Sequence, residues 1–247
     1  MKKMNTEQPP GDAELRTQYK QEAARRAVEF VESGMVVGLG TGSTASFATQ
    51  CIARSLRERR LKEIVGFATS KAVWEEAQRL GIPMMDEEML QTIDLTIDGA
   101  DEVDPDLNLI KGGGGALLRE KIVAQASRRV IIIADDSKLS SRLGTLHALP
   151  VEVLYFGWRS QLRYLESLGA RTQVRRNPDG SFFGTDSGNI ILDCSFGRIA
   201  RPEELAGELS ARAGIVEHGL FIGLATDLIV AGREGIRHLA CKKSGRQ

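Results

Sequence analysis

The chain has 247 residues, 42% of them hydrophobic, and its 33 basic residues balance 33 acidic ones. This composition is ordinary for a packed protein with one large domain, or a large and a small one, and no membrane span is needed. Because the charges balance, no global field attracts nucleic acid or an anionic membrane, so affinity for an anionic ligand must be local.

The cysteines and histidines show no metal-binding or disulfide pattern. The three cysteines are far apart and form no C-x-x-C pair, and the three histidines lack metal-ligand spacing, so a reducing cytoplasm fits best. These residues are Cys51, Cys194, Cys241, His147, His218 and His238. Residues 1–12 are polar and lack the apolar segment of a secretory signal, so we expect them to form an extension.

The first predicted elements lead to a glycine-rich turn. Residues 13–32 have helical periodicity and stop at Ser33-Gly34, which is typical of a helix end, and residues 35–39 predict a short buried strand. Gly40-Thr41-Gly42-Ser43-Thr44 then turns into an amphipathic helix that continues to about Arg59. A strand, glycine-rich turn and helix in this order often hold phosphate on the free N–H groups of the helix.

Three tests narrow the ligand of this turn. No Gly-Lys-Ser/Thr follows, so the Walker pattern fails, and Ser43 replaces the third glycine of the dinucleotide pattern. The next predicted strand, residues 64–68, ends in Thr69-Ser70-Lys71 and offers no acidic residue for ribose hydroxyls. The turn therefore favours a phosphate monoester, with a simple capped turn as the alternative.

Two acidic residues follow the next predicted strand. Residues 69–80 predict a helix and residues 82–84 a short strand, and the β-branched alternation of residues 93–97 predicts a further strand. This last strand delivers Asp98 and Asp101 to its carboxyl end. Ligand sites of open α/β sheets lie at that edge.

Residues 98–121 hold an unusual density of charges and glycines. Lys111 precedes four glycines, residues 112–115, which let the main chain approach a ligand closely. A helix is expected from about Ala116, and Glu120 lies on it. Such a segment is typical of an active site.

Glu120 lacks a partner on its own helix. At 100° per residue, Lys121, Gln125 and Arg128 share a polar face, whereas Glu120 lies apart from it with no basic residue three or four positions away. This pattern favours a functional carboxylate. A glutamate on a second exposed stripe is the structural alternative.

The acidic loop does not match a calcium site. Asp104-x-Asp106-x-Asn108 begins like a calcium loop, but Leu109 replaces the required glycine and Gly115 replaces the closing glutamate. No metal site is therefore predicted. A looser magnesium site on Asp98, Asp101 and Asp104 is a weaker alternative.

The rest of the chain predicts a central strand and a second domain. Residues 129–134 form the most apolar strand, which should be buried on both faces, and Lys138 emerges at the same sheet edge as Asp98. Strands that alternate with helices indicate a mostly parallel sheet. From residue 149 the order becomes strand, helix, strand, strand, helix, strand, which is typical of a ferredoxin-like fold. Those elements are expected at 151–155, 160–168, 171–175, 189–193, 202–212 and 215–220.

We therefore predict an α/β protein with two domains. Residues 1–148 and 221–247 should form a catalytic domain with a Rossmann-like, mostly parallel sheet and helices on both faces. Residues 221–229 and 230–239 should return to that sheet. Residues 149–220 should form a small ferredoxin-like α+β domain that serves packing or subunit contact.

Three motifs together resemble one enzyme family. Asp98-Gly-Ala-Asp101-Glu102, Lys111-Gly-Gly-Gly-Gly-Ala and Arg119-Glu120-Lys121 resemble the signature of type A ribose-5-phosphate isomerases, and residues 38–44 resemble its phosphate loop. The similarity extends over roughly residues 20–240. One position departs from the family pattern. The family is expected to have a threonine or another small polar residue before the Arg-Glu-Lys, whereas this chain has Leu118.

The resemblance implies an aldose–ketose isomerase of the non-oxidative pentose phosphate pathway that interconverts D-ribose 5-phosphate and D-ribulose 5-phosphate through an enediolate, without a cofactor. It implies Glu120 as the base, Asp98 for hydroxyl protons, Asp101 for orienting the sugar and Lys111 for stabilising the enediolate. The implied substrate-binding residues are Thr41, Gly42, Ser43, Thr44, Asp98, Gly99, Ala100, Asp101, Lys111, Gly112, Gly113, Gly114 and Lys138. A cytoplasmic homo-oligomer, dimeric or tetrameric, that binds neither nucleic acid nor membrane is also expected.

Two other function classes compete with this interpretation. A phosphosugar-sensing module would need binding residues but no base, and it would usually carry a helix-turn-helix domain. The segment before the first core helix is too short for one, and both Glu120 and Lys111 are present. An acyl- or CoA-transferase-like enzyme is the second alternative, although the sequence shows no adenine or pantetheine pocket.

Overall fold

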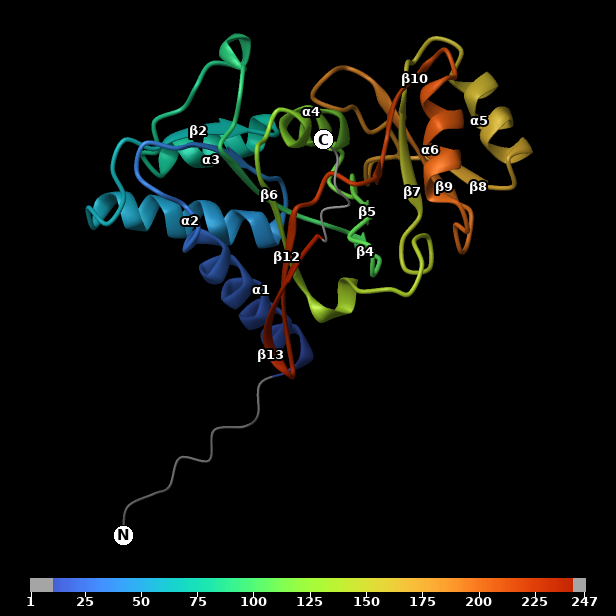
Figure 1. Cartoon of the computed structure of the whole chain (residues 1–247). Coiled ribbons are helices and arrows are strands. Elements are labelled where there is room, and N and C mark those ends of the chain that lie inside the picture. The colour runs from blue at the N-terminus through green and yellow to red at the C-terminus, as the bar shows by residue number, and fades with distance from the viewer. Residues whose placement is uncertain (1–10, 242–247) are drawn as a thin grey trace, which may run out of the picture.

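A six-stranded sheet forms the centre of the protein, whose computed structural model describes residues 11–241 (Figure 1). The strand order is β13-β12-β6-β3-β1-β2, and every neighbouring pair is parallel except β12 and β13. The strands are β1 (Val36–Leu39), β2 (Val65–Ala68), β3 (Leu95–Gly99), β6 (Val130–Asp135), β12 (Asp227–Gly232) and β13 (Gly235–Ala240). All residues of β6 are buried, as the apolar run of this strand predicts.

Helices cover both faces of this sheet. Apolar residues of α1 and α2 pack with Ile131 and Ile133, whereas Ala124 of α4 packs with Ile132 on the opposite face. The helices of this part are α1 (Asp12–Val28), α2 (Ser43–Arg57), α3 (Lys71–Arg79) and α4 (Leu117–Gln125), with short 3₁₀ turns η1 (Glu87–Met89) and η2 (Asp136–Lys138). The predicted Rossmann-like architecture is confirmed.

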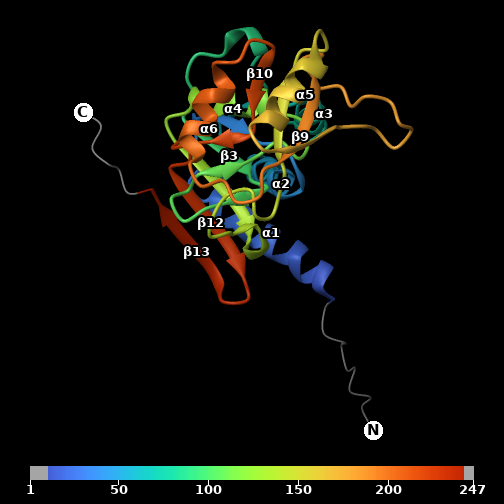
Figure 2. The same ribbon diagram turned by 90° about the vertical axis from the view of Figure 1, so that its right-hand side faces the viewer.

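A second, antiparallel sheet has the order β10-β7-β9-β8 and carries two helices. Its elements, in chain order, are β7 (Leu149–Val153), α5 (Trp158–Ser167), β8 (Arg171–Val174), β9 (Ile190–Ser195), α6 (Pro202–Ser210) and β10 (Ile215–His218). Figure 2 shows α5 and α6 on the side turned toward the viewer. This is the predicted ferredoxin-like order. The exact division into domains at residues 149 and 220 stays a prediction.

A third, very short sheet was not predicted. It joins β4 (Glu102–Val103), β5 (Leu109–Ile110) and β11 (Leu220–Phe221) in the order β11-β5-β4. The backbone N–H of Lys111 continues this pairing by donating to the carbonyl of Gly219 at 2.9 Å. The sheet therefore fixes where the chain enters the glycine run.

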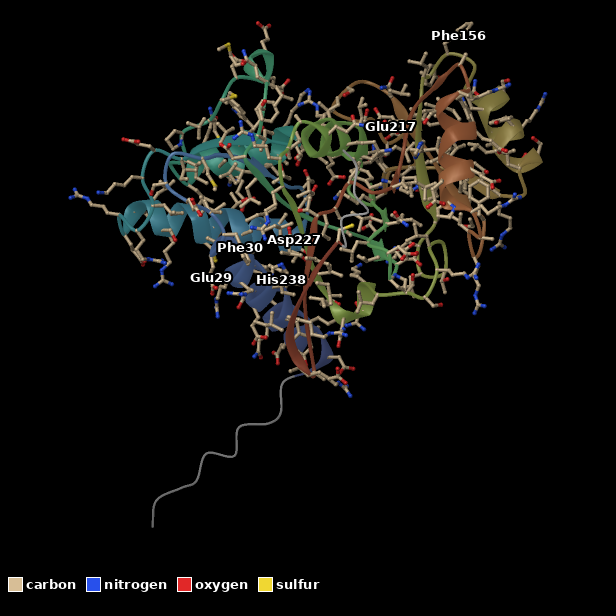
Figure 3. The ribbon with its side chains drawn as sticks, in the orientation of Figure 1. Glu29, Phe30, Phe156, Glu217, Asp227 and His238 are labelled. Atoms are coloured by element: carbon tan, nitrogen blue, oxygen red, sulfur yellow. The ribbon has the colours of Figure 1, made fainter. Side chains whose placement is uncertain are left out.

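The C-terminal hairpin packs near the end of α1. The ring of His238, on β13, packs edge to face on the ring of Phe30, with 5.2 Å between the ring centroids (Figure 3). Nε2 of His238 also forms a hydrogen bond with Oδ1 of Asp227 at 2.7 Å. Asp227 also accepts two hydrogen bonds from Arg129, each at 2.8 Å. These contacts hold β12 and β13 against the rest of the large sheet.

Several predicted boundaries were wrong. The first helix ends at Val28, not Glu32, because Phe30 and Val31 bond to carbonyls three residues back and tighten the chain into turns. Residues 82–84 contribute one bridge, from Met84 to Gly66, since Pro83 has no N–H to donate.

The C-terminal segment was also divided at the wrong place. Residues 230–232 continue β12, which pairs with β6 as far as Ala231, and Phe221 belongs to β11. The turn between β12 and β13 falls at residues 233–234 and is followed by Gly235, whose φ is +92°. The buried apolar run on both sides of residue 230 hid this boundary.

The expected N-terminal extension falls mainly on residues 1–10, which lie outside the described residues, while Asp12 already begins α1. None of the helices within residues 11–241 has the length and apolar character needed to cross a bilayer.

Candidate active site

A cavity at the carboxyl ends of β1, β3 and β6 gathers the predicted site residues. It is lined by Lys20, Thr41, Gly42, Ser43, Thr44, Gly99, Ala100, Asp101, Lys111, Gly112, Gly113, Gly114, Glu120 and Lys138. Every sequence-predicted site residue except Asp98 is in this set. Asp98 lies directly behind it, because its carboxylate contacts Lys111.

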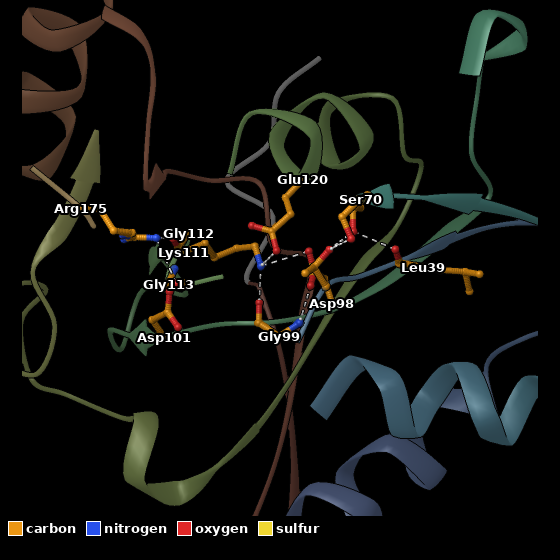
Figure 4. Close-up of polar contacts among 12 residues, drawn as sticks. Leu39, Ser70, Asp98, Gly99, Asp101, Lys111, Gly112, Gly113, Glu120 and Arg175 are labelled. Atoms are coloured by element: carbon orange, nitrogen blue, oxygen red, sulfur yellow. Dashed lines mark hydrogen bonds and ion pairs between the residues drawn. The ribbon is translucent and has the colours of Figure 1, made fainter. Parts of the chain in front are cut away.

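Lys111 is the central charge of this cavity. Its Nζ lies 3.0 Å from Oδ2 of Asp98 and 3.2 Å from Oε1 of Glu120, and it donates to the Gly99 carbonyl at 2.6 Å (Figure 4). An ammonium has three hydrogens, so these three contacts fix its position. Its side chain is 4% exposed, and those of both carboxylates are equally buried.

Glu120 has one carboxylate oxygen without a partner. Its Oε2 is buried and accepts no hydrogen bond from any residue within 11–241. A buried acceptor left unbonded is costly and rare in folded proteins. Glu120 also lines the cavity, so an acceptor without a hydrogen-bond partner belongs to the wall of the candidate site.

Burial and the neighbouring charges shift the pKa values of Glu120, Asp98 and Lys111. It raises the pKa of Glu120 to about 8, against the opposing effect of Lys111 and with a further upward effect from Asp98. Burial likewise raises the pKa of Asp98, again opposed by Lys111. Burial alone would lower the pKa of Lys111, but the two carboxylates outweigh it and the pKa is raised.

One ammonium therefore faces two buried carboxyl groups. A single positive charge cannot fully stabilise two buried negative charges, so each carboxyl disfavours ionisation of the other and the pKa values of both are raised. Two carboxyls coupled in this way are suited to one donating a proton while the other accepts one.

The predicted phosphate loop precedes α2. Gly42 adopts φ +115° and ψ 170°, a conformation open to glycine, immediately before the helix. Oγ1 of Thr41 bonds to the hydroxyls of Thr69 at 2.8 Å and Ser70 at 2.9 Å. The loop is thereby tied to the end of β2, with the first N–H groups of α2 left for a ligand.

At two positions, carboxylate side chains lie so close to the main chain that only glycine fits. A Cβ on Gly40 would lie 2.2 Å from Oδ1 of Asp98. A Cβ on Gly113 would lie 2.8 Å from Oδ1 of Asp101, whose Oδ2 accepts the Gly113 N–H at 2.7 Å. The glycines therefore serve to pack the main chain against the acidic residues.

Asp104 is directed into its own loop. Its Oδ1 accepts the backbone N–H groups of Asp106 at 3.0 Å and Asn108 at 2.8 Å. Within the described part of the chain, no three or more His, Cys, Asp or Glu side chains cluster so as to hold a metal ion. The geometry gives no support to the magnesium alternative on Asp98, Asp101 and Asp104.

Lys121 differs from Gln125 and Arg128, with which it was predicted to share one polar face, because only those two residues are exposed. It is buried and donates to Oε1 of Glu217 and to the carbonyl of His218, each at 2.6 Å. Burial lowers its pKa, with Glu217 acting in the opposite direction. Lys121 thus ties α4 to β10, and the helix periodicity could not reveal a partner 96 residues away.

Residues 65–235 match the family model described as ribose 5-phosphate isomerase A (phosphoriboisomerase A). A Chloroflexus aurantiacus protein named ribose-5-phosphate isomerase A is 58% identical over 223 residues, which cover 90% of this chain and 93% of that protein. A protein of the same name from Desulfatibacillum aliphaticivorans is also 58% identical, over 89% of this chain and 96% of its own length. The chain belongs to the ribose-5-phosphate isomerase A family.

Solved structures of ribose-5-phosphate isomerases share the whole fold. The Plasmodium falciparum enzyme superposes with a TM-score of 0.88 at 38% identity, over 92% of this chain and 99% of that one. A second relative, solved in complex with phospho-erythronic acid, gives a TM-score of 0.88 at 36% identity, over 90% of this chain and 98% of that one. The resemblance inferred from the motifs is confirmed.

Lys20 is a cavity residue that sequence reasoning missed. It comes from α1, and its Nζ donates to Oγ of Ser43 at 3.0 Å, beside the phosphate loop. On the sequence it is one of several polar residues of an amphipathic helix, and no local pattern distinguishes it. Only the packing of α1 beside α2 brings its charge to the cavity.

Proposed function

We propose that this protein interconverts D-ribose 5-phosphate and D-ribulose 5-phosphate, with Glu120 as the proton-transfer base. The observation that carries the proposal is the unbonded Oε2 of Glu120, a residue that lines the cavity together with Lys111, whose ammonium also contacts Asp98 behind the cavity wall. A base needs an oxygen within reach of a C–H bond, and a partner-free oxygen on a rigid helix provides it. Membership of the family supports the same substrate.

The reaction moves one proton between carbons and one between oxygens. Glu120 takes the proton from C2 of the aldose and returns it to C1, while a proton passes from O2 to O1. Asp98, the second carboxyl bound to Lys111, is placed to carry the oxygen-bound proton and to assist ring opening. Lys111 stabilises the enediolate, whose negative charge develops on oxygen.

The other cavity residues bind the substrate in this proposal. Residues 41–44 and Lys20 hold the phosphate with N–H groups, hydroxyls and an ammonium. Asp101, residues 112–114 and Lys138 hold the sugar hydroxyls. The relative solved with phospho-erythronic acid supports a phosphorylated sugar ligand for this cavity. We also infer, from the family, a cytoplasmic homo-oligomer.

Gly42→Val should raise the KM for ribose 5-phosphate by about tenfold or more, because φ +115° is strained for any residue with a Cβ and the loop would move from the phosphate. Steady-state kinetics measure the effect, with Gly184→Ala as control, since a Cβ there meets nothing within 4 Å. Free ribose should be a poor substrate of the wild type. Equal turnover of ribose and ribose 5-phosphate would exclude the phosphate assignment.

The pH profile of kcat/KM should rise to a plateau above about pH 8, because the pKa of Glu120 is raised to about 8 and only its ionised form accepts a proton from carbon. Rates from pH 5.5 to 10 measure this limb. Glu120→Asp should keep a limb but shift it. A profile already flat from pH 5.5 upward would contradict the assignment.

The contribution of Glu120 to folding stability should fall as pH rises, whereas kcat/KM should increase. The folded-state pKa of Glu120 lies above its ordinary value of 4.5, so its contribution to stability is complete below about pH 4.5 and is lost as pH rises through about 8. The ionised form that the reaction uses is therefore the form that the fold tolerates less well.

A further inference from the structure

Arg175 reaches the glycine run from the small antiparallel sheet. It follows β8, and its backbone N–H donates to the Ile191 carbonyl of β9 at 2.8 Å. Its Nη1 donates to the Gly112 carbonyl at 2.8 Å and to the Gly113 carbonyl at 3.0 Å (Figure 4). The small sheet is thus hydrogen-bonded, through Arg175, to the loop that carries the candidate substrate-binding glycines.

The guanidinium of Arg175 is fixed on its other side. Nε donates to Oδ2 of Asp193 at 2.9 Å, and Nη2 donates to Oδ1 of the same carboxylate. The Phe183 ring lies 5.6 Å from Cζ, and the Arg175 side chain is 14% exposed. A planar fork bound to a carboxylate on one side keeps a single orientation, so its remaining N–H groups point at the loop.

Arg175 and Asp101 hold opposite ends of one peptide unit. The carbonyl of Gly112 accepts from Arg175, and the N–H of Gly113, in the same peptide, donates to Asp101 at 2.7 Å. The described chain contains no cis peptide bond, so the carbonyl and N–H of each peptide point in opposite directions. This peptide therefore spans from the small sheet to the cavity side.

The next peptide unit follows the same geometry. Its carbonyl, from Gly113, accepts the second hydrogen bond of Arg175, so its N–H, from Gly114, points away from the guanidinium. Gly114 lines the cavity. A cation on the carbonyl also polarises the peptide and strengthens its N–H as a donor.

We propose that Arg175, oriented by Asp193, is a positioning residue that aims the Gly114 N–H at the oxygen on which enediolate charge develops. The inference rests on the proposed isomerase reaction. Arg175 itself contacts the loop and is not among the residues that line the cavity. Donors that are fixed before the reaction stabilise a developing oxyanion most, so loosening the loop should affect kcat more than KM.

Arg175→Met should lower kcat by about 10- to 10²-fold and change KM for ribose 5-phosphate less than threefold, because a small misplacement of catalytic donors carries a cost of this size. Arg176→Met is the matched control, since the neighbouring guanidinium is directed to the Gly180 carbonyl. It should keep kcat within twofold. Melting curves of both variants report whether they fold.

Chemical rescue separates positioning from general packing. Millimolar guanidinium ion should raise kcat of Arg175→Ala, whereas equal concentrations of sodium chloride should not. Asp193→Asn removes the orienting charge but leaves the guanidinium, and it should lower kcat less than Arg175→Met does. In the double variant Arg175→Met/Asp193→Asn, the loss of kcat should be smaller than the combined losses of the two single variants, because the two residues act as one unit.

Several results would overturn the inference. Wild-type kcat in Arg175→Met, an equal loss in Arg176→Met, or fully additive effects of Arg175 and Asp193 would each do so. If Arg175→Met does not fold, undiminished kcat in Asp193→Asn would overturn it. Wild-type turnover in the same assay tests the proposed function separately, and an inactive wild type would remove both proposals.

Discussion

Glu120→Gln should lower turnover of ribose 5-phosphate by at least about 10²–10⁴-fold, the factor usually credited to a positioned base. The amide keeps the size of the side chain but cannot take a proton from carbon. Substrate binding, measured by calorimetry, should stay within about tenfold of wild type, because the phosphate contacts remain. The variant should also lose exchange of the C2 hydrogen with deuterated solvent.

Stability separates a catalytic from a packing role for Glu120. Since the raised pKa means that the ionised carboxylate disfavours the fold, Glu120→Gln should not lower the melting temperature at pH 8 relative to wild type. Glu208→Gln, on the exposed side of α6, is the control and should change neither activity nor stability. Undiminished turnover in Glu120→Gln would assign the base to Asp98 or Asp101. Joint loss of binding and folding would show a packing role.

The site could be predicted largely because its residues are close together along the chain. Asp98, Lys111 and Glu120 fall within 23 positions, and β3 carries the first of them to the sheet edge that parallel strands use for ligands. The periodicity of α4 also indicated that Glu120 lacks a helical partner. Its actual partner, Lys111, lies in the preceding loop.

Contacts between distant segments could not be predicted in the same way. Lys20, Arg175 and Lys121 reach their partners across 23, 63 and 96 positions, and each is an ordinary basic residue in its local pattern. Strands of two residues, such as β4 and β11, carry too little periodicity to be recognised. These elements depend on tertiary packing, which local propensity does not encode.

Lys111→Met should lower kcat by about 10²–10³-fold, as expected when a group that stabilises a developing oxyanion is removed. The substitution also leaves Asp98 and Glu120 without the ammonium that holds their pKa values down against burial, so both pKa values should rise further. The base is then protonated over more of the neutral range, which adds to the loss. Lys71→Met, at an exposed lysine, is the control.

The pH dependence of the stability of Lys111→Met should show whether Asp98 and Glu120 are the charge partners of Lys111. Carboxyls whose folded-state pKa lies above the unfolded values of 3.8 and 4.5 stabilise the fold at low pH and lose that contribution as pH rises through the folded-state pKa. The deficit in melting temperature relative to wild type should therefore be small near pH 5 and grow toward pH 9, where an unpaired buried charge costs about 3–5 kcal/mol. A deficit that is constant from pH 5 to 9 would show that Lys111 acts through packing of its aliphatic stem. One that shrinks as pH rises would mean that the two carboxyls are not its charge partners.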